Sequence, residues 1–572
     1  MSSAVFSYLS FWVFAYWILD VLPIKLSIFF PAVNLVFLAV LVGLWIKRGR
    51  PAFKKPSNQD LAAFGIFVLT ALLRAVPALN RITGSVGDMT QHNDMTQIIL
   101  MNDGFSKTYA PFYDFAHFGE YPLGFHTLSA ILSQNTGLPF YRATQWISVL
   151  SFCLLHLGLY SFLRRKWSSV RAMSVSAIVL LLAHYPQFLN QWGSAPTALS
   201  TAFLFYAFYL LAQISENPAP SWPEKVTAGF VLAAGLLCHL IPPVGFAVYF
   251  PIWLIVHRHL GKEPLLPALK NLIPVFILGF ILVLPFLMNF NFDVFDASKT
   301  SISSGHENSV ARITDLVSLS NPAAKFLGDA AALFVFLIGP SLSAVALLFL
   351  LLSRDRAAKI EFLSFGAVFL VLYACFRFRW MPAYHLFQAE RIHYFLLLPL
   401  AILIGNELKP FAAVILAGLW AAGGLESVKR NFESHYAAFR KDGRLLQFIL
   451  RDASFGSYWA FACDRVNAGV TPEDLEAFKW IRENIDENAV FLVNYADAGH
   501  LIPSFTGRRI TDPHGMDMWH GEELKNWNDT RPATHIYVGK NPSPAYPVAW
   551  TRGDKLLHNY GGASVYLLSK LP

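Results

Sequence analysis

Two side chains on one short polar stretch could carry acid–base chemistry. The stretch follows the third apolar run of the chain and contains Asp88 and His92. Residues four apart share one face of a helix, so a helix here would place the carboxylate beside the imidazole. Such a pair can act as a general base or hold a metal ion. The simpler interpretation is a polar loop in which Asp88 caps a helix.

The same polar stretch continues with further candidate ligands. Asp94 lies two residues beyond His92, and His126 ends the motif Tyr-Pro-Leu-Gly-Phe-His at 121–126. The proline and glycine of this motif favour a sharp turn, and a helical pattern follows it. We therefore expect His92, Asp94 and His126 near an acceptor or a metal ion. Oxygen and nitrogen ligands of this kind suit Mg²⁺ or Mn²⁺.

A second group of polar side chains lies late in the chain, just before an apolar run. It contains Arg377, Arg379, Arg391 and His393. Arginine binds phosphate well because its planar guanidinium presents a fork of donors. Anchoring in the lipid headgroup region would also explain these residues. Arg391 lies beside Glu390 at the start of the apolar run, where a charge is costly unless it is paired or used, and this favours a functional role.

Other polar residues are more typical of solvated loops than of a site. They include Ser194 in the turn at 191–196 and His239 before a Pro-Pro pair. His500, near the C-terminal end, could face a substrate or lie on the surface.

Apolar runs must position these side chains. Hydrophobic residues make up 55% of the 572 residues and charged residues only 14%, against roughly 25% in soluble proteins. A spanning helix needs about 20 apolar residues. Runs of that kind, about thirteen in all, lie at 4–22, 27–46, 61–79, 141–163, 170–188, 197–214, 226–241, 244–256, 268–288, 331–352, 361–377, 392–406 and 410–425.

The short basic loops give the expected orientation. Lysines and arginines gather at 47–55, 164–171, 258–262 and 354–359, which fall on one side if the helices alternate. By the positive-inside rule that side is the cytoplasm. The longer loops, at about 80–140, 289–330 and 377–391, would then face outward together with the C-terminal part. The basic residues behind the net charge of +8 cluster in short loops, so the charge does not indicate a nucleic-acid partner.

Residues 426–572 have a different, polar composition. Thr471 before a proline and two acids predicts an N-cap and the first turn of a helix. Strand-like runs follow at 489–493, 534–539 and 563–568. We therefore predict an all-α polytopic membrane domain over 1–425 and a small extracytoplasmic α/β or α+β domain over 426–572.

The motifs together resemble the GT-C class of polytopic membrane glycosyltransferases. The pattern from Asp88 and His92 to the Tyr-Pro-Leu-Gly-Phe-His motif is similar to that of a prokaryotic group in this class, as is the Trp-Ile-Arg-Glu-Asn helix at 480–484. The resemblance covers most of the chain in architecture and a few short motifs in sequence. Members of the class have many spans, an outer-face active site and a polyprenyl-phosphate-linked sugar donor.

The resemblance implies a role for each group of residues. The catalytic acid of the class lies in the first long outer loop, the place that Asp88 occupies here. Asp88, alone or with His92 or Asp94, would deprotonate an acceptor hydroxyl in an inverting transfer. The leaving lipid phosphate would be stabilised by Arg391, Arg377, Arg379 and His393. The implied partners are the lipid-linked donor, membrane lipid, and a glycan, lipid or protein acceptor.

Other functions fit parts of the pattern. A transporter or flippase would carry charges near the middle of its spans and often a two-fold repeat. In this sequence the charges gather at the outer ends of the runs and no repeat is present, which favours an enzyme. A lipid-linked glycan polymerase or ligase would rely chiefly on a large loop late in the chain. A receptor or scaffold would be insensitive to a change at Asp88.

Overall fold

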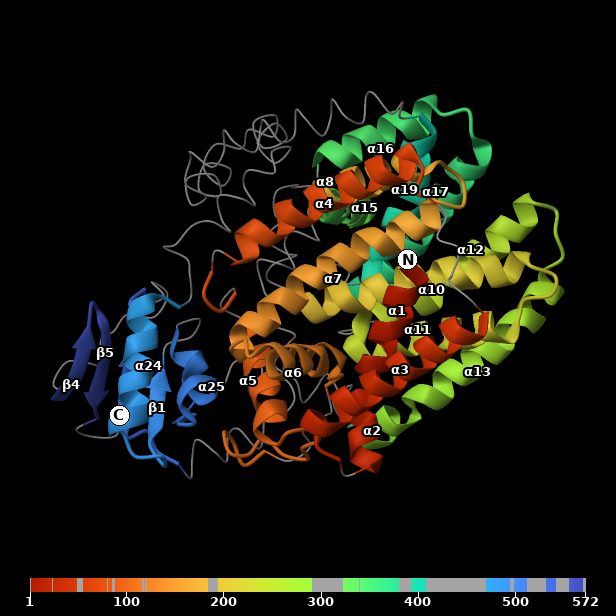
Figure 1. Ribbon diagram of the computed structural model, residues 1–572. Coiled ribbons are helices and arrows are strands. Elements are labelled where there is room, and N and C mark those ends of the chain that lie inside the picture. Colours follow the sequence, from red (N-terminus) through yellow and green to blue (C-terminus); the bar gives the residue numbers. More distant parts are fainter. Residues whose placement is uncertain are drawn as a thin grey trace.

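The structure is a computed structural model in which most of the chain is described. The described residues are 2–22, 24–48, 55–79, 81–84, 88–115, 118, 121–183, 194–290, 322–338, 340–378, 380, 392–407, 470–493, 498–511, 531–541 and 555–568. Helices occupy the first part of the chain up to residue 407, and a small sheet with helices forms the last part (Figure 1). We call residues 470–568 the C-terminal domain.

The helical part contains both long and short helices. The helices are α1 (Ser2–Val13), α2 (Ala15–Val21), α3 (Leu26–Arg48), α4 (Asn58–Leu79), α5 (Asp88–Met101), α6 (Gly124–Thr136), α7 (Phe140–Leu163), α8 (Ser169–Leu182), α10 (Ala195–Glu216), α11 (Trp222–Cys238), α12 (Ile241–Leu260), α13 (Leu265–Asn289), α15 (Pro322–Ile338), α16 (Pro340–Leu352), α17 (Arg356–Arg377), η3 (His393–Leu396) and α19 (Leu397–Glu407).

The apolar helices make this an integral membrane protein. Six described segments are long and apolar enough to cross a bilayer, and four shorter apolar helices accompany them. The six are Ser2–Val21, Phe140–Leu163, Ala195–Glu216, Ile241–Leu260, Leu265–Asn289 and Arg356–Cys375. The predicted total of about thirteen spans stays a prediction, and the run at 410–425 lies outside the described residues.

Prolines lie where two of the apolar stretches are divided. The chain turns between α11 and α12, and a proline lies at the N-terminus of α12. The predicted single span at 331–352 is wrong, because α15 ends at Ile338 and α16 begins at Pro340. Proline lacks a backbone N–H and disfavours a helical conformation in the residue before it, so an apolar run that contains one need not be one helix.

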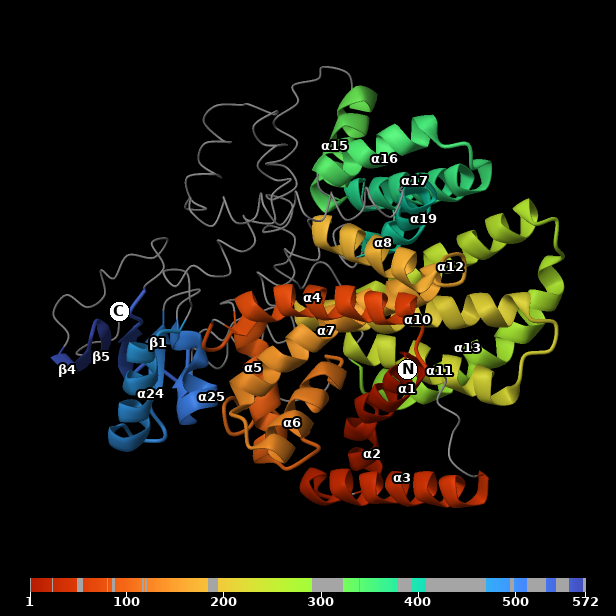
Figure 2. The same ribbon diagram turned by 45° about the horizontal axis from the view of Figure 1, so that its top comes forward.

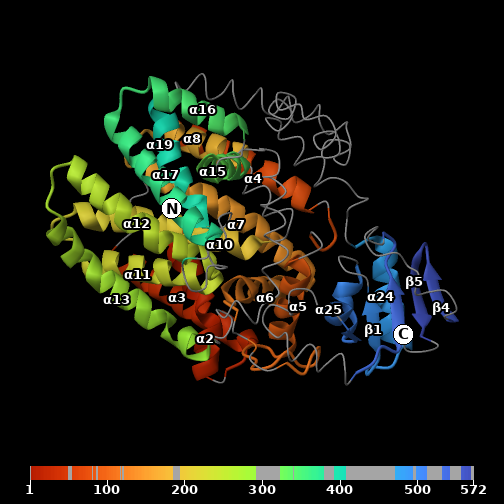
Figure 3. The same ribbon diagram turned by 180° about the vertical axis from the view of Figure 1, so that it is seen from behind.

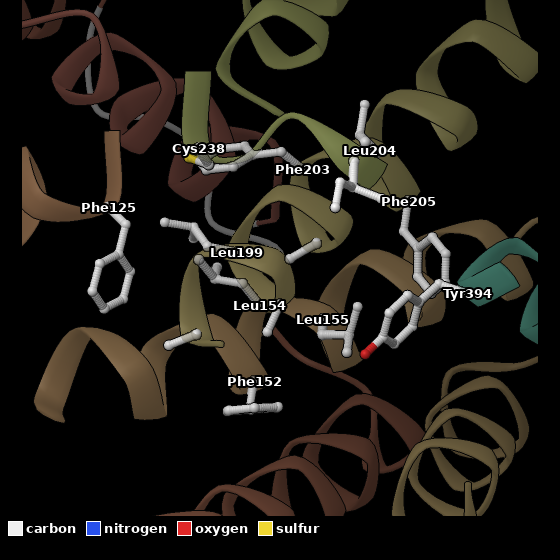
Figure 4. Packing of buried hydrophobic residues seen from close by; sticks show 14 of the residues in the cluster. Phe125, Phe152, Leu154, Leu155, Leu199, Phe203, Leu204, Phe205, Cys238 and Tyr394 are labelled. Atoms are coloured by element: carbon white, nitrogen blue, oxygen red, sulfur yellow. The ribbon is translucent and has the colours of Figure 1, made fainter. Parts of the chain in front are cut away.

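Helix α10 lies at the centre of the bundle. It packs against α7, α11, α12, α13 and α6, and almost every one of its side chains is buried. Figure 4 shows Leu199 and Phe203 of this helix among the apolar side chains of α7 and α11. Gly158 and Gly235 allow close approach, since a methyl group at either position would come within 3 Å of an α10 atom. Small residues at such crossings favour helix association in membranes.

The C-terminal domain is a mixed sheet with one long helix against it. Its elements are α24 (Pro472–Asn484), β1 (Val490–Val493), η4 (Ala498–Leu501), α25 (Ile502–Thr506), β2 (Arg509–Ile510), β3 (His535–Val538), β4 (Lys555–Tyr560) and β5 (Ala563–Leu567). The strand order is β2-β1-β3-β5-β4. The pairs among β2, β1 and β3 are parallel, and those among β3, β5 and β4 are antiparallel.

The expected elements of this domain are present. Thr471 caps α24 in a capping box with Asp474, and β1, β3 and β5 fall within the three predicted strand runs. The sequence did not indicate β2 or the hairpin strand β4. The predicted boundary near 425 lies outside the described residues, so the division at that position stays a prediction.

The C-terminal domain lies against one end of the helical part. Helix α25 packs on α5, and Figures 1 and 3 show it between the sheet and α5 from both sides. Helices α5 and α6 belong to the long loop at about 80–140, which is predicted to face outward. This loop therefore has its own packed structure and joins the two parts of the molecule.

Candidate functional site

Helix α5 is a polar helix in a buried position. Ten of its fourteen residues are buried, and most of the ten are polar. It packs against α6 and α7 on one side and against η4 and α25 of the C-terminal domain on the other. Burying polar groups costs free energy unless they are hydrogen-bonded. Packing alone does not explain a buried helix of this composition, whereas a binding site that uses its polar side chains does.

Asp88 begins this helix and is held from another element. The hydroxyl of Ser194 donates a hydrogen bond of 2.7 Å to Asp88 Oδ2. Ser194 is the N-cap residue of α10, so two helix N-termini converge on the carboxylate. The partial positive charges of helix N-termini favour an anionic group there. Asp88 is partly exposed, which leaves its carboxylate accessible to a ligand.

His92 faces His126 of α6. Its Nδ1 lies 3.0 Å from Nε2 of His126, and the two side chains are 3% and 0% exposed. A pair of neutral imidazoles can make this bond, with one ring donating and the other accepting. Burial, and then the proximity of His92, hold the pKa of His126 well below its usual value. His126 is therefore uncharged at neutral pH, and it is hydrogen-bonded to His92 between α5 and α6.

Aromatic rings surround the histidine pair. Tyr121 lies 6.0 Å from His92, and Phe125 lies 5.7 Å from it, measured between ring centroids. His239, at the end of α11, stands edge-on to Tyr121 at 5.8 Å. The Tyr-Pro-Leu-Gly-Phe-His motif thus folds back onto α5.

Asp94 lies on a different face of α5 and meets the C-terminal domain. It is 4% exposed and is hydrogen-bonded by the side chain and backbone of Ser504 in α25. Burial raises the pKa of Asp94 to about 8, and the bonds from Ser504 act in the opposite direction. The expectation that Asp94 shares a site with Asp88 stays a prediction, but its described contacts are with the C-terminal domain.

Several buried polar atoms around α5 have no hydrogen-bond partner among the described residues. They are Nε2 of Gln91, Oδ1 of Asn93, Oδ1 of Asp94 and Nδ1 of His126. Buried polar atoms are rarely left unpaired in native proteins, and each one asks for an explanation. A polar ligand with several hydroxyl groups would supply the missing partners.

Residues judged to be solvated loop positions turn out to be buried. Ser194 is 3% exposed and bonds to Asp88, and His239 is 5% exposed. His500 is also buried, at 1% exposure, in η4 against α5. That interpretation of Ser194 and His239 was wrong because a polar residue in a predicted turn gives no sign that another element covers it.

The late arginine group is described only in part. Arg377 ends α17, and the side chain of Arg377 together with Arg379 and Arg391 lies outside the described residues. His393 is 4% exposed, and its Nδ1 lies 2.6 Å from the hydroxyl of Tyr249 on α12. The role of the arginines in binding phosphate therefore stays a prediction, whereas His393 is engaged inside the bundle.

A metal centre is not evident in the described part of the chain. No group of three or more His, Cys, Asp or Glu side chains there could hold an ion. The expectation of Mg²⁺ or Mn²⁺ near the first long loop stays a prediction.

Comparisons with known proteins give likenesses in structure alone. No family model and no curated protein sequence matches the chain. Among solved structures, it is similar to an oligosaccharyltransferase of Archaeoglobus fulgidus in the apo form, with 12% identity and a TM-score of 0.49 over 83% of this chain and 69% of the other. It is also similar to ArnT from Cupriavidus metallidurans in the apo state, with 15% identity and a TM-score of 0.48 over 88% of this chain and 97% of ArnT.

A second structure of ArnT, bound to undecaprenyl phosphate, gives 16% identity and a TM-score of 0.46 with the same coverage. The likeness is weak. Every one of these TM-scores is below 0.5. These likenesses therefore carry no conclusion about chemistry, which has to be argued from the residues of this chain.

Proposed function

We propose that this protein is a membrane glycosyltransferase. It transfers a sugar from a polyprenyl-phosphate-linked donor to a hydroxyl group of an acceptor on the outer face of the membrane. The observation that carries the proposal is the position of Asp88. This carboxylate is partly exposed, is held by Ser194 at the meeting point of two helix N-termini, and begins the buried polar helix α5.

The proposed reaction is a single inverting displacement. Asp88 takes the proton from the acceptor hydroxyl, and the hydroxyl oxygen forms a bond to the anomeric carbon of the sugar. The bond from that carbon to the phosphate oxygen breaks, and its electron pair leaves with the lipid phosphate. A positioned general base contributes typically 10²- to 10⁴-fold to such a step. The hydrogen bond from Ser194 fixes the direction in which the carboxylate points.

Fixed cations would stabilise the phosphate as it leaves. We assign this role to Arg391 with Arg377 and Arg379, because arginine matches phosphate geometry and its charge is permanent. We assign His393 no part in it, because its side chain is buried and bonded to Tyr249. The support for the arginines is their residue type and their place just before the apolar helix that begins near residue 392.

The acceptor side of the site is supported by the unpaired atoms on α5. Gln91 and Asn93 each bury an amide atom without a partner among the described residues. Amide groups bind sugar hydroxyls because they offer both donors and acceptors. We therefore propose an acceptor that carries several hydroxyl groups, such as a glycan or a sugar-bearing lipid.

The proposal is tested by the release of polyprenyl phosphate. The purified protein in lipid nanodiscs receives a panel of polyprenyl-phosphate sugars together with a pool of glycan and lipid acceptors. We expect wild type to release the carrier from at least one donor, and Asp88→Asn to lose activity by about 10²-fold or more. Ser194→Ala should lose about tenfold, since a hydrogen bond to a charged group contributes roughly 1.5–3 kcal/mol.

Asp103→Asn is the matched control. Asp103 lies in the same loop and also accepts a serine hydroxyl, from Ser27, but on the side of α3. It should keep near-wild-type activity. Equal activity in wild type and Asp88→Asn would exclude Asp88 as the base. No donor consumption with any acceptor would instead favour the transporter or flippase, which moves its substrate without cleaving it.

A further inference from the structure

The contact between the two parts of the molecule contains a buried carboxyl group. Asp94 of α5 faces α25 of the C-terminal domain, where Ser504 hydrogen-bonds to it. Its Oδ1 has no hydrogen-bond partner among the described residues. In contacts between protein surfaces, charged side chains are normally found at the solvent-accessible rim and are rare in the buried centre. A carboxyl group at 4% exposure in the middle of this contact is therefore unusual.

Other parts of the contact are apolar or lie at its edge. Phe505, next to Ser504, stacks on Tyr141 at 5.1 Å and meets Phe140 edge-on at 5.1 Å. At the edge, Arg531 pairs with Asp114 of the loop. The contact thus has an aromatic anchor, an exposed ion pair and the buried Asp94.

The charged and titratable groups near Asp94 do not neutralise it. On α5 itself, Asp88 and His92 lie on other faces, and His126 of α6 is bonded to His92. Arg142 of α7 donates to the carbonyl oxygen of Arg81. On the side of the C-terminal domain, His500 lies in η4, and the segment 502–506 of α25 has no titratable group. The arginines Arg509 and Arg531 of this domain pair with Asp114 at the edge of the contact. No cation contributes to the electrostatic environment of Asp94 in the described part of the chain.

We propose that Asp94 is a proton-operated latch between α5 and the C-terminal domain. When Asp94 is protonated, the domain seats on α5 and holds that helix, and with it Asp88, in position. When the proton is lost, a carboxylate remains that must regain water, and the contact opens. Asp94 is in this sense a positioning residue that acts through α5. The latch itself does not depend on the proposed sugar transfer, and only its consequence for catalysis rests on that function.

The direction of the pH effect follows from the two states. In water Asp94 would titrate at about 4, whereas in the contact burial raises its pKa to about 8. Docking therefore takes up a proton at neutral pH. The contact is most stable below about pH 4, loses up to tenfold in its docking constant for each pH unit above that, and reaches its weakest state above about pH 8.

Hydrogen–deuterium exchange of the full-length protein in nanodiscs tests the latch without any sugar donor. The readout is the protection of the segment 498–506, corrected for the intrinsic pH dependence of exchange, with the helix 472–484 of the same domain as internal reference. We expect wild-type protection of 498–506 to fall by up to about 100-fold between pH 6 and pH 8. The reference helix should not change.

Asp94→Asn replaces the carboxyl group with an amide that does not titrate. The segment 498–506 should therefore stay protected at both pH 6 and pH 8. Asp114→Asn, at the edge of the same contact, is the matched control and should keep the wild-type pH response. Ser504→Ala removes the side-chain hydrogen bond, which favours the charged form of Asp94, and keeps the backbone bond, so the loss of protection should move to higher pH. The proposal is overturned if wild type shows no pH response, or if Asp94→Asn responds as wild type does.

Sugar transfer supplies the second readout. Wild-type transfer should decline between about pH 6 and pH 8, and Asp94→Asn should lack this decline. If no transfer is found with any donor, the proposed function fails while the exchange experiment still decides the latch. If transfer is found but the exchange of 498–506 depends neither on pH nor on Asp94, the latch is overturned while the proposed function stands.

Discussion

At the scale of single residues, two aspartates of the same loop differ in what surrounds them. Asp103 accepts bonds from Ser27 and Gln134 and ties the loop to α3 and α6. Asp88 accepts a hydrogen bond from the Ser194 hydroxyl at its Oδ2 and lies at the start of a helix with buried polar residues. The first carboxylate links parts of the fold, and the second begins a helix on which buried amide atoms of Gln91 and Asn93 lack a partner among the described residues.

The buried His126 should make the protein sensitive to acid. The pKa of His126 in the folded protein lies well below 6.5 because of burial and the proximity of His92. In mildly acidic solution this histidine is therefore protonated in the unfolded chain but not in the folded protein. Stability from this group is fully present above about pH 6.5 and is lost as pH falls below it, by up to about 1.4 kcal/mol per pH unit.

Thermal unfolding midpoints between pH 7.5 and pH 5 measure this effect. The wild-type midpoint should fall with acidity, and His126→Gln should flatten the slope. His259→Gln, a change at an exposed histidine of α12, serves as control and should leave the slope as in wild type. An unchanged slope in His126→Gln would contradict the account of the histidine pair.

The site shows how far residue spacing alone can predict function. The interval between Asp88 and His92 places the two residues on one face of a helix if the segment is helical, and the segment is helix α5. It could not show that His92 turns to His126, because that contact needs α6 to fold back over α5. Ser194 and Ser504 reach α5 from 106 and 410 positions away in sequence, and no local pattern encodes such a pairing.

At the scale of elements, close helix crossings depend on a few glycines. A methyl group at Gly158 of α7 would lie 2.9 Å from the carbonyl oxygen of Ala202 and 3.0 Å from Phe205 Cβ on α10. Backbone and Cβ atoms cannot move aside as a flexible side chain can. Helices α7 and α10 would have to separate, and their neighbours on α6 and α11 would lose contact.

Gly158→Ala should therefore destabilise the bundle by about 1–3 kcal/mol. Gly366→Ala in α17, where nothing lies within 4 Å of the added methyl group, is the control and should be neutral or slightly stabilising, because alanine favours helix more than glycine does. Denaturant or thermal unfolding in nanodiscs compares the two variants. Equal stability would show that the α7–α10 crossing is looser than described.

Elements were predicted well where the pattern was strong and local. The capping box of α24 and the apolar strands β1, β3 and β5 were found from sequence. Strand β4 was missed because its side chains are mostly exposed, so it has no apolar alternation. The two glycines at 561 and 562, both with positive φ, mark the tight turn of its hairpin and were the available signal.

At the scale of the whole molecule, the docking of the C-terminal domain should depend more on its aromatic anchor than on its ion pair. Arg531 is 38% and Asp114 is 54% exposed at the side chain, and exposed ion pairs contribute about 0–1 kcal/mol. Phe505 is partly buried and contacts Tyr141 and Phe140. Removal of a fully buried aromatic side chain costs about 3–5 kcal/mol, and this is the upper bound for Phe505.

Limited proteolysis at neutral pH would rank the two. Phe505→Ala should expose the segment 498–511 to cleavage, whereas Asp114→Asn should behave nearly as wild type. Thermal unfolding of the C-terminal domain separates loss of docking from loss of folding, since Phe505 also contacts Phe478 inside the domain. Greater cleavage in Asp114→Asn than in Phe505→Ala would reverse the expected order.

Helix α3 stands at the margin of the bundle (Figure 2), with apolar side chains such as Leu35 and Ile46 exposed by 66% and 78%. Its 23 residues give it a length of about 34 Å, slightly more than the roughly 30 Å of a bilayer core. Its first turn is bonded through Ser27 to Asp103, directly after α5. A thinner bilayer would increase the tilt of such a helix through hydrophobic mismatch. Bilayer thickness would then act, through the hydrogen bonds between Ser27 and Asp103, on the loop that follows α5.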